Sequence, residues 1–177
     1  NTRSDTLSLH DALPILENDK EAPAPVRDVT YTKMSGSVLL TYTLPSDPDL
    51  LYVAASYTNK AGKKYEFKAS YFTNTLLVEG FGDTDTYSLD VYAVDRSENY
   101  SEPVNIQVAA DTPPVQAAYE TLEVQPDFGG MTFSFDNASK ADLTVYVSTP
   151  NADNEMVNAE TFYTGLAKAT FSVRGFL

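Results

Sequence analysis

Oxygen-bearing side chains gather in three turn-like segments of the sequence, where they could bind a calcium ion. The residues concerned are Asp47 and Asp49, Asp83 and Asp85, and Asp95 with Glu98 and Asn99. A dedicated calcium loop supplies oxygen ligands at alternating positions and closes with a bidentate glutamate, and these segments lack that spacing. Aspartate and asparagine also stabilise turns, and Pro48 fits an ordinary turn. We interpret these residues as turn residues and expect neither a metal ion nor another cofactor.

The titratable residues give little support to catalysis. Glycoside hydrolysis needs two carboxylates at a fixed distance in a cleft, one of them with a raised pKa. The acidic residues here fall mainly in predicted turns and at outward strand positions. Cysteine is absent, and the single histidine, His10, lies in a stretch that we exclude below, so serine has no base to activate it. We therefore predict that the chain is not an enzyme and has no catalytic or metal-ligating residue.

Aromatic side chains offer a different chemistry, because their faces can stack on sugar rings. The chain contains 12 tyrosines and 9 phenylalanines, and tyrosine combines an apolar ring with a polar tip. The residues that we expect to be exposed and available for glycan stacking are Tyr71, Phe72, Tyr92, Tyr100 and Tyr163. Sandwich edges and contacts between modules also use such residues, so both interpretations are open.

Composition and charge restrict the partners. The chain has 12 Lys and Arg against 25 Asp and Glu, a formal net charge of -13, which would repel a nucleic acid backbone. No apolar run is long enough to span a bilayer. The absence of cysteine is unusual for a small secreted eukaryotic domain, whereas a bacterial envelope protein can rely on its core. We expect a bacterial, extracytoplasmic location.

The N-terminal stretch from Thr6 to Ile15, TLSLHDALPI, is similar to one reading frame of a common sequencing adapter. It contains His10 and Asp11 and has no apolar segment typical of a targeting peptide. We therefore treat residues 1–21 as an artefactual or disordered leader and give His10 no chemical role.

Short runs with alternating apolar and polar residues begin near Val26, separated by turn-forming residues. This pattern is typical of an all-β sandwich. The predicted strands cover 26–32, 37–44, 50–58, 65–70, 75–79, 86–94 and 103–109. Alternation is clear in the sixth, where Tyr87, Leu89, Val91 and Ala93 form one face and Ser88 and Asp90 point outward. Each strand therefore has one face toward a core.

A double proline at Pro113 and Pro114 marks a boundary, because proline cannot donate a strand hydrogen bond and favours an extended connection. After it the pattern repeats with a shift of 93 to 95 residues, from position 49 to 142 and from 78 to 173. The matched pairs are Asp49-Leu50 with Asp142-Leu143, Tyr42 with Phe135, and Val78-Glu79-Gly80-Phe81 with Val173-Arg174-Gly175-Phe176. We predict a first module over 22–110, a linker over 111–115 and a second module over 116–177.

The same shift places the counterparts of the last two strands of the first module beyond position 177. We therefore expect the second module to be incomplete at its C-terminus, with an open sheet edge and uncovered apolar surface. Its predicted core residues are Phe133, Phe135, Val145, Val147, Phe171 and Val173. If the modules are complete, we expect a monomer.

The first module resembles the fibronectin type III and related bacterial immunoglobulin-like domains. The segment Val78 to Phe81, followed by Tyr87 to Val94, is similar to the corner and the strand that follows it in that family. The resemblance implies that Tyr87 is a structural corner tyrosine whose hydroxyl bonds nearby backbone. Tyr42 stands where the family often has a tryptophan, a residue that this chain lacks.

The segments Leu44 to Val53 and Tyr92 to Asn99 are also similar to paired domains of unknown function in Bacteroidota surface lipoproteins of glycan-utilisation loci. That resemblance implies a non-catalytic spacer or interaction role at the outer membrane, with a missing lipid anchor as the only membrane attachment. Its implied partners are a polysaccharide or other surface glycan-utilisation proteins. Two alternatives stay open: direct carbohydrate binding through exposed aromatics, and accessory domains of a glycan-degrading enzyme.

Overall fold

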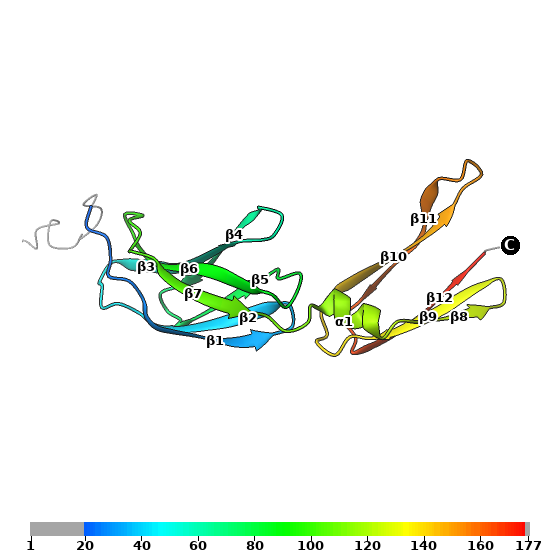
Figure 1. The fold of residues 1–177 in the computed structure, drawn as a ribbon, viewed down its shortest axis with the longest axis horizontal. Helices are drawn as coiled ribbons and strands as arrows, with labels where there is room; N and C mark the ends of the chain where they lie inside the picture. The colour runs from blue at the N-terminus through cyan, green and yellow to red at the C-terminus, as the bar shows by residue number, and fades with distance from the viewer. Residues whose placement is uncertain (1–19, 176–177) are drawn as a thin grey trace, which may run out of the picture. The chain divides into compact units, whose positions relative to one another are not determined.

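The computed structural model describes residues 20–175, which form two compact units (Figure 1). The leader assignment, with the adapter-like stretch and His10, falls almost entirely outside the described residues. Every predicted strand of the first module is present, with its ends within two residues of the prediction. Its strands are β1 (Arg27–Met34), β2 (Ser37–Thr43), β3 (Leu50–Thr58), β4 (Lys64–Ser70), β5 (Thr75–Glu79), β6 (Thr86–Asp95) and β7 (Val104–Ala109).

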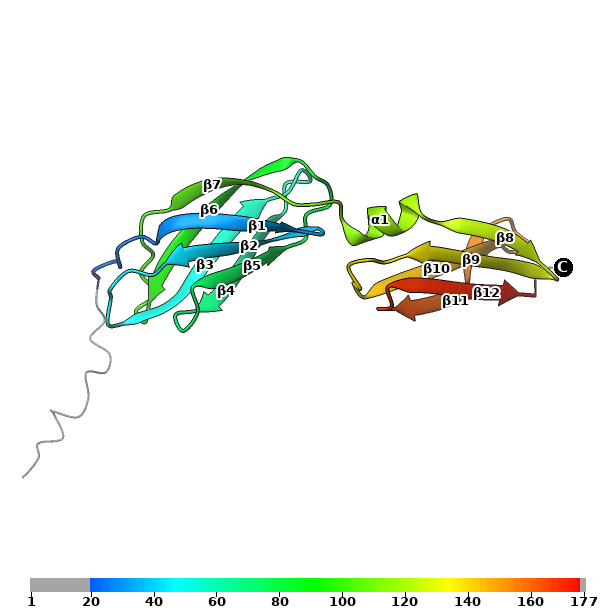
Figure 2. The ribbon, with the colours of Figure 1, turned by 90° about the horizontal axis from the view of Figure 1, so that it is seen from below.

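The first module is a sandwich of two sheets, with strand orders β1-β2-β5 and β4-β3-β6-β7 (Figure 2). Alternation along each strand decides which side chains lie between the sheets. The buried side chains of β2, β3 and β6 include Val38, Leu40, Tyr42, Val53, Ala55, Tyr57, Tyr87, Leu89, Val91 and Ala93. The intervening side chains of β3 and β6 point away from the core and form the outer face of the four-stranded sheet.

Three buried tyrosines, Tyr42, Tyr57 and Tyr87, occupy the core of this module. Burial raises the pKa of Tyr42 to about 12, and its hydroxyl donates to the Thr75 carbonyl over 3.3 Å. Tyr87, at the start of β6, is 8% exposed, and its ring meets Tyr57 edge-on at 5.7 Å between centroids. The contact from the Tyr87 hydroxyl to nearby backbone stays a prediction.

The second module begins with a short helix that the sequence interpretation missed. The prediction of an extended 111–115 segment is wrong for its last residues, because α1 (Pro114–Glu120) begins at the second proline. Proline fits the first helical position, where no hydrogen-bonded N–H is needed. Pro113 keeps the extended conformation expected of it, with φ −59° and ψ 148°. Within residues 20–175 no helix is long and apolar enough to cross a membrane.

The strands of the second module follow the predicted repeat. They are β8 (Glu123–Asp127), β9 (Gly130–Asp136), β10 (Leu143–Pro150), β11 (Met156–Thr164) and β12 (Lys168–Arg174). The sheet β12-β9-β8 has the same order as β5-β2-β1, and the pair β10-β11 corresponds to β3-β4. Strand β3 also pairs with β6, whereas among the described residues β10 pairs only with β11. One edge of β10 therefore has no strand beside it in the described part of the chain.

The core of the second module is assembled from the residues that the sequence predicts. Phe133, Phe135, Val147 and Val173 are buried, together with Ala118 and Ala169. Val145 and Phe171 are only partly buried. Phe133, Phe162 and Phe171 pack with ring centroids 4.6 to 5.6 Å apart. The centre of the cluster is therefore buried and its margin is partly exposed.

Candidate functional site

The outer face of the sheet β4-β3-β6 carries the strongest candidate site of the first module. Strand β3 lies between its neighbours, with Ala54 opposite both Lys68 of β4 and Tyr92 of β6. Two residues further along, Ser56 lies opposite Glu66 and Asp90. The small side chains of the central strand are thus flanked by long ones on both sides.

This difference in size creates a recess. Ala54 and Ser56 form its floor, and both are nearly buried, at 2% and 6% exposed. Its walls are Tyr92 and Tyr100 on one side and Lys64 and Glu66 on the other. The enclosed volume is about 340 Å³. A recess of this size with aromatic and polar walls is suited to a small polar ligand or to one unit of a polymer.

The turn between β6 and β7 places Tyr100 beside Tyr92. Ser101 donates its N–H to the Ala93 carbonyl over 2.9 Å, and its hydroxyl oxygen accepts from the Ala93 N–H over 3.0 Å. Within the turn, the carboxylate of Asp95 accepts from the N–H groups of Ser97 and Asn99, each over 2.8 Å. Its second oxygen accepts from the Asn99 side-chain amide over 2.8 Å. Asp95 is 1% exposed, so it anchors the turn from inside.

The two wall tyrosines meet each other edge to face. Their ring centroids lie 5.8 Å apart with an interplanar angle of 79°. Tyr100 is 45% exposed and therefore presents part of its ring to solvent. An aromatic pair in this arrangement is itself stabilising, by about 0.5 to 1.5 kcal/mol. The pair therefore holds the exposed ring in place before any ligand arrives.

A chain of polar groups continues from Tyr100 across β3. Its hydroxyl lies 3.3 Å from the hydroxyl of Tyr52, which also accepts from the Lys68 ammonium over 3.3 Å. That ammonium forms an ion pair with Glu66 at 3.1 Å and lies 4.6 Å from the centroid of the Tyr52 ring. These contacts link the two walls of the recess, from Tyr100 on one side to Glu66 on the other.

The same contacts keep the groups in one protonation state. Glu66, followed by Tyr52, raises the pKa of Lys68 by accepting hydrogen bonds from its ammonium. The hydrogen bond with Tyr52 and partial burial raise the pKa of Tyr100, and burial followed by the nearby Asp90 carboxylate raises the pKa of Tyr92. Tyrosine ordinarily titrates near pH 10. Both wall hydroxyls therefore stay protonated at neutral pH and can donate hydrogen bonds.

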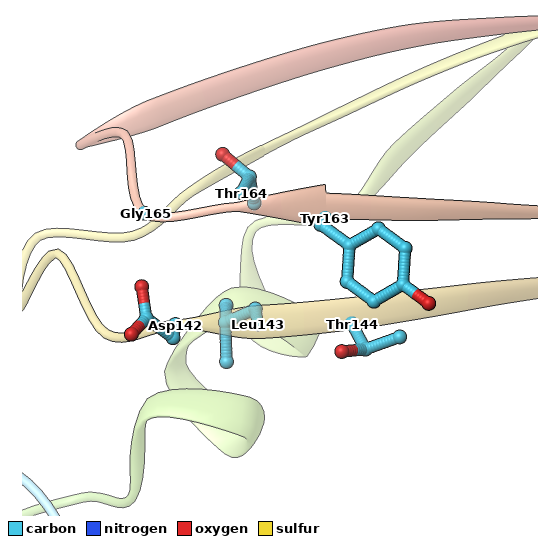
Figure 3. A pocket seen from close by; sticks show the side chains of 6 residues that line it. All are labelled: Asp142, Leu143, Thr144, Tyr163, Thr164 and Gly165. Carbon is cyan, nitrogen blue, oxygen red and sulfur yellow. The ribbon is translucent and has the colours of Figure 1, made fainter.

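The structure brings together two of the five residues expected to stack on glycans, Tyr92 and Tyr100. Tyr71 and Phe72 form a separate pair after β4, with ring centroids 4.1 Å apart and Phe72 82% exposed. Tyr163 lies in the second module, beside a shallow pocket at the base of the β10-β11 hairpin (Figure 3). The five residues thus occupy three separate surfaces.

Sequence reasoning missed Lys64 and Glu66, which form one wall of the recess, and the neighbouring Tyr52 and Lys68. They were not selected, because their meeting depends on the register between β3 and β4. One signal was available in the sequence: Ala54 and Ser56 are small residues at consecutive outward positions of a strand whose neighbours carry long side chains. Small residues so placed indicate a hollow on the sheet face.

The acidic turns behave as capped turns. Asp47 accepts from the Asp49 N–H over 3.2 Å, and Asp83 accepts from the Asp85 N–H over 3.0 Å. Asp95 caps its own turn in the same manner. Among residues 20–175, no group of three or more histidine, aspartate or glutamate side chains is placed to hold a metal ion.

Asp49 makes the stability of this module depend on pH. The hydrogen bond with the Asp47 side chain, with smaller contributions from burial and from Asp47 and Asp95 charge, raises the pKa of Asp49 from 3.8 to about 6. The folded state therefore binds a proton more readily than the unfolded state, so stability falls as pH rises from about 4 to 6.

We expect Asp49→Asn to remove this fall in stability and to raise the thermal midpoint at pH 7. Thermal melts of the full chain at several pH values measure the effect, with Asp85→Asn as control. A pH profile unchanged by Asp49→Asn but changed by the control would contradict the assignment.

Comparison with known proteins accounts for most of the chain. Residues 23–110 match the family model described as Domain of unknown function (DUF4959), and residues 111–177 match Domain of unknown function (DUF5126). No curated protein matches the sequence. The two matches meet between Ala110 and Asp111.

Several solved structures are similar at low sequence identity. A segment of two fibronectin type III domains from chicken tenascin is 15% identical, with 86% of this chain and 93% of that one covered and a TM-score of 0.46. Chitinase ChiA74 from Bacillus thuringiensis is 16% identical, with 93% and 28% covered and a TM-score of 0.42. The spore cortex lytic enzyme SleM of Clostridium perfringens is 10% identical, with 50% and 28% covered and a TM-score of 0.42. The chain thus spans little more than a quarter of the length of either enzyme.

Proposed function

Since the chain is a tandem of fibronectin type III-like domains of unknown function, we propose that it supplies non-catalytic interaction modules for glycan capture by a bacterial cell-surface protein. In this proposal the first module binds a neutral glycan in the recess on its outer face. One observation carries it: two tyrosines stand over a floor of small residues, with hydrogen-bonding groups opposite them.

The chemistry of the recess suits a sugar. A pyranose ring has C–H groups on its faces and hydroxyl groups around its edge. The exposed part of the Tyr100 ring can stack on such a face, while Ser56, Lys64 and Glu66 can exchange hydrogen bonds with the hydroxyl groups. The net charge of -13 disfavours an anionic polymer. A neutral glycan satisfies both conditions.

The location is part of the same proposal. We place the protein on the outer membrane of a member of the Bacteroidota, held by a lipid anchor, and we expect the chain to be monomeric. Other surface glycan-utilisation proteins are the protein partners that this location suggests.

A spacer role is the second candidate, favoured by the segment between β7 and α1. Asp111 donates its N–H to the Met34 carbonyl and accepts from the Gly36 N–H, both over 3.0 Å. The Ser35 hydroxyl donates to the Thr112 carbonyl over 2.7 Å. These bonds hold Asp111 and Thr112 against the turn between β1 and β2. If the chain instead forms accessory domains of a glycan-degrading enzyme, the recess would bind the glycan for that enzyme.

Short neutral oligosaccharides test binding at the recess. We expect the full chain to bind at least one of them on a glycan array, and the double variant Tyr92→Ala/Tyr100→Ala to bind it at least tenfold more weakly by calorimetric titration, as expected when two wall rings are removed. Tyr71→Ala/Phe72→Ala removes another aromatic pair, in which Phe72 is 82% exposed, and serves as the matched control. Equal affinities of the wild type and the Tyr92/Tyr100 variant would exclude the recess and favour the spacer role.

A further inference from the structure

The β10-β11 hairpin of the second module exposes two tyrosines on one face. The strands are antiparallel, with Thr144 opposite Tyr163 and Tyr146 opposite Thr161. Tyr146 is 68% exposed and Tyr163 is 75% exposed. Figure 3 shows the Tyr163 ring lying across the hairpin toward β10, beside Thr144. Each of two successive cross-strand pairs thus combines one tyrosine with one threonine.

This face is distinct from the core of the module. The alternate residues Val145, Val147 and Phe162 belong to the hydrophobic cluster, so the tyrosines point to the opposite side of the hairpin. A strand added beside the open edge of β10 would widen the sheet within its own plane. The tyrosines therefore lie on the outer face of the sheet whether or not a strand lies beside β10.

The two rings are placed as diagonal neighbours, which in an antiparallel pair lie roughly 7–8 Å apart. The threonine hydroxyls of the same two pairs lie between them as hydrogen-bonding groups. Within these two pairs the side chains beside the rings are threonines and not aliphatic residues. Rings separated by hydroxyl groups match a chain of pyranose units, which alternates C–H faces with polar edges.

A pocket at the base of the hairpin extends the surface beyond Tyr163. It encloses about 310 Å³ and is lined by Asp142, Leu143, Thr144, Tyr163, Thr164 and Gly165. A Cβ atom added at Gly165 would lie 3.0 Å from the Asp142 carboxylate oxygen, so glycine at this position avoids a close contact with the carboxylate. The carboxylate can accept hydrogen bonds from sugar hydroxyls and disfavours an anionic ligand.

We infer that the outer face of β10-β11 is a second binding surface for a neutral polysaccharide, separate from the recess of the first module. It occupies the sheet that corresponds to β3-β4 in the repeat, so both modules bind through equivalent outer faces. Two sites on one chain give a polymer an avidity that short oligosaccharides do not show.

Affinity electrophoresis in native gels tests this inference on the full chain. The gels contain mixed-linkage β-glucan, xyloglucan, glucomannan, galactan or starch as soluble neutral probes. We compare the wild type with Tyr146→Ala/Tyr163→Ala, with Tyr92→Ala/Tyr100→Ala and with all four changes combined. Tyr119→Ala, which removes a tyrosine that is 76% exposed on α1, is the control.

On the polysaccharide that retards the wild type, we expect each double variant to weaken the apparent affinity at least tenfold and the combined variant to migrate as in a gel without polysaccharide. If Tyr146→Ala/Tyr163→Ala is retarded like the wild type, the second surface is refuted while the recess stands. If Tyr92→Ala/Tyr100→Ala is retarded like the wild type, the proposed function of the recess fails and the second surface stands. A wild type that no polysaccharide retards refutes both.

Discussion

Replacing Asp95 by alanine should destabilise the first module by about 3 kcal/mol, equivalent to roughly a 100-fold shift in its unfolding equilibrium. The Asp95 carboxylate is 1% exposed and accepts three hydrogen bonds, two from backbone and one from Asn99. Alanine leaves those donors without their acceptor inside the turn, and buried donors without partners are costly. The turn also positions Tyr100, so glycan binding should weaken together with stability.

Hydrogen exchange of the full chain measures the Asp95 effect locally. The slowest amides of β3 and β6 should exchange roughly 100-fold faster in Asp95→Ala, while those of β9 and β12 should not change. Asp83→Ala is the control, because Asp83 also caps a turn but is less buried. We expect Asp83→Ala to destabilise the first module by less than about 1 kcal/mol, as is typical of partly exposed capping residues. Equal effects of the two substitutions would show that the burial of Asp95 is not what matters.

The second large effect concerns the sheet that contains β10. Strand β3 has partners on both sides, whereas β10 pairs only with β11 in the described part of the chain. Alternate amides of β10 face the open edge, and the core residues beneath it are partly exposed. We expect the protected amides of β10 and β11 to exchange at least 100-fold faster than those of β3 and β6, because exchange there needs only local opening of a two-stranded pair.

Mass spectrometry after deuterium labelling resolves the two hairpins in one experiment. Peptides from β9 and β12 provide the internal comparison, since those strands pair in a three-stranded sheet of the same module. Equally slow exchange in β10-β11 and in β3-β6 would show that the edge of β10 is covered in solution, and the argument from the repeat would be wrong.

The strands could be predicted from sequence because the alternation of apolar and polar residues shows which side chains of each strand face the core. In β6, Tyr87, Leu89 and Val91 alternate with polar residues, and that period alone places them between the sheets. The turn that begins at Asp95 could also be predicted, because the residues that stabilise it are close together in the sequence. The helix α1 was missed because a double proline favours an extended connection, although proline is also well suited to the first position of a helix.

The recess could be predicted only in part. Tyr92 was recognisable as an outward residue because it lies between the buried Val91 and Ala93. The place of Tyr100 beside it depends on the hydrogen bonds of Ser101 with β6, and the contact of Lys68 with Tyr52 depends on strand register. Such long-range pairings leave no local pattern in a single sequence, so the meeting of the side chains that form the walls emerged only from the fold.

The most direct test of glycan binding at the recess is an NMR titration of the isotope-labelled full chain with an oligosaccharide that binds on the array. Within the first module, the largest amide shift changes should fall on Ala54, Ser56, Glu66, Tyr92 and Tyr100. The amides of the opposite sheet, β1-β2-β5, should stay unchanged. Shift changes confined to that sheet or to the Tyr71-Phe72 turn, with none at Ala54 or Tyr92, would contradict the account.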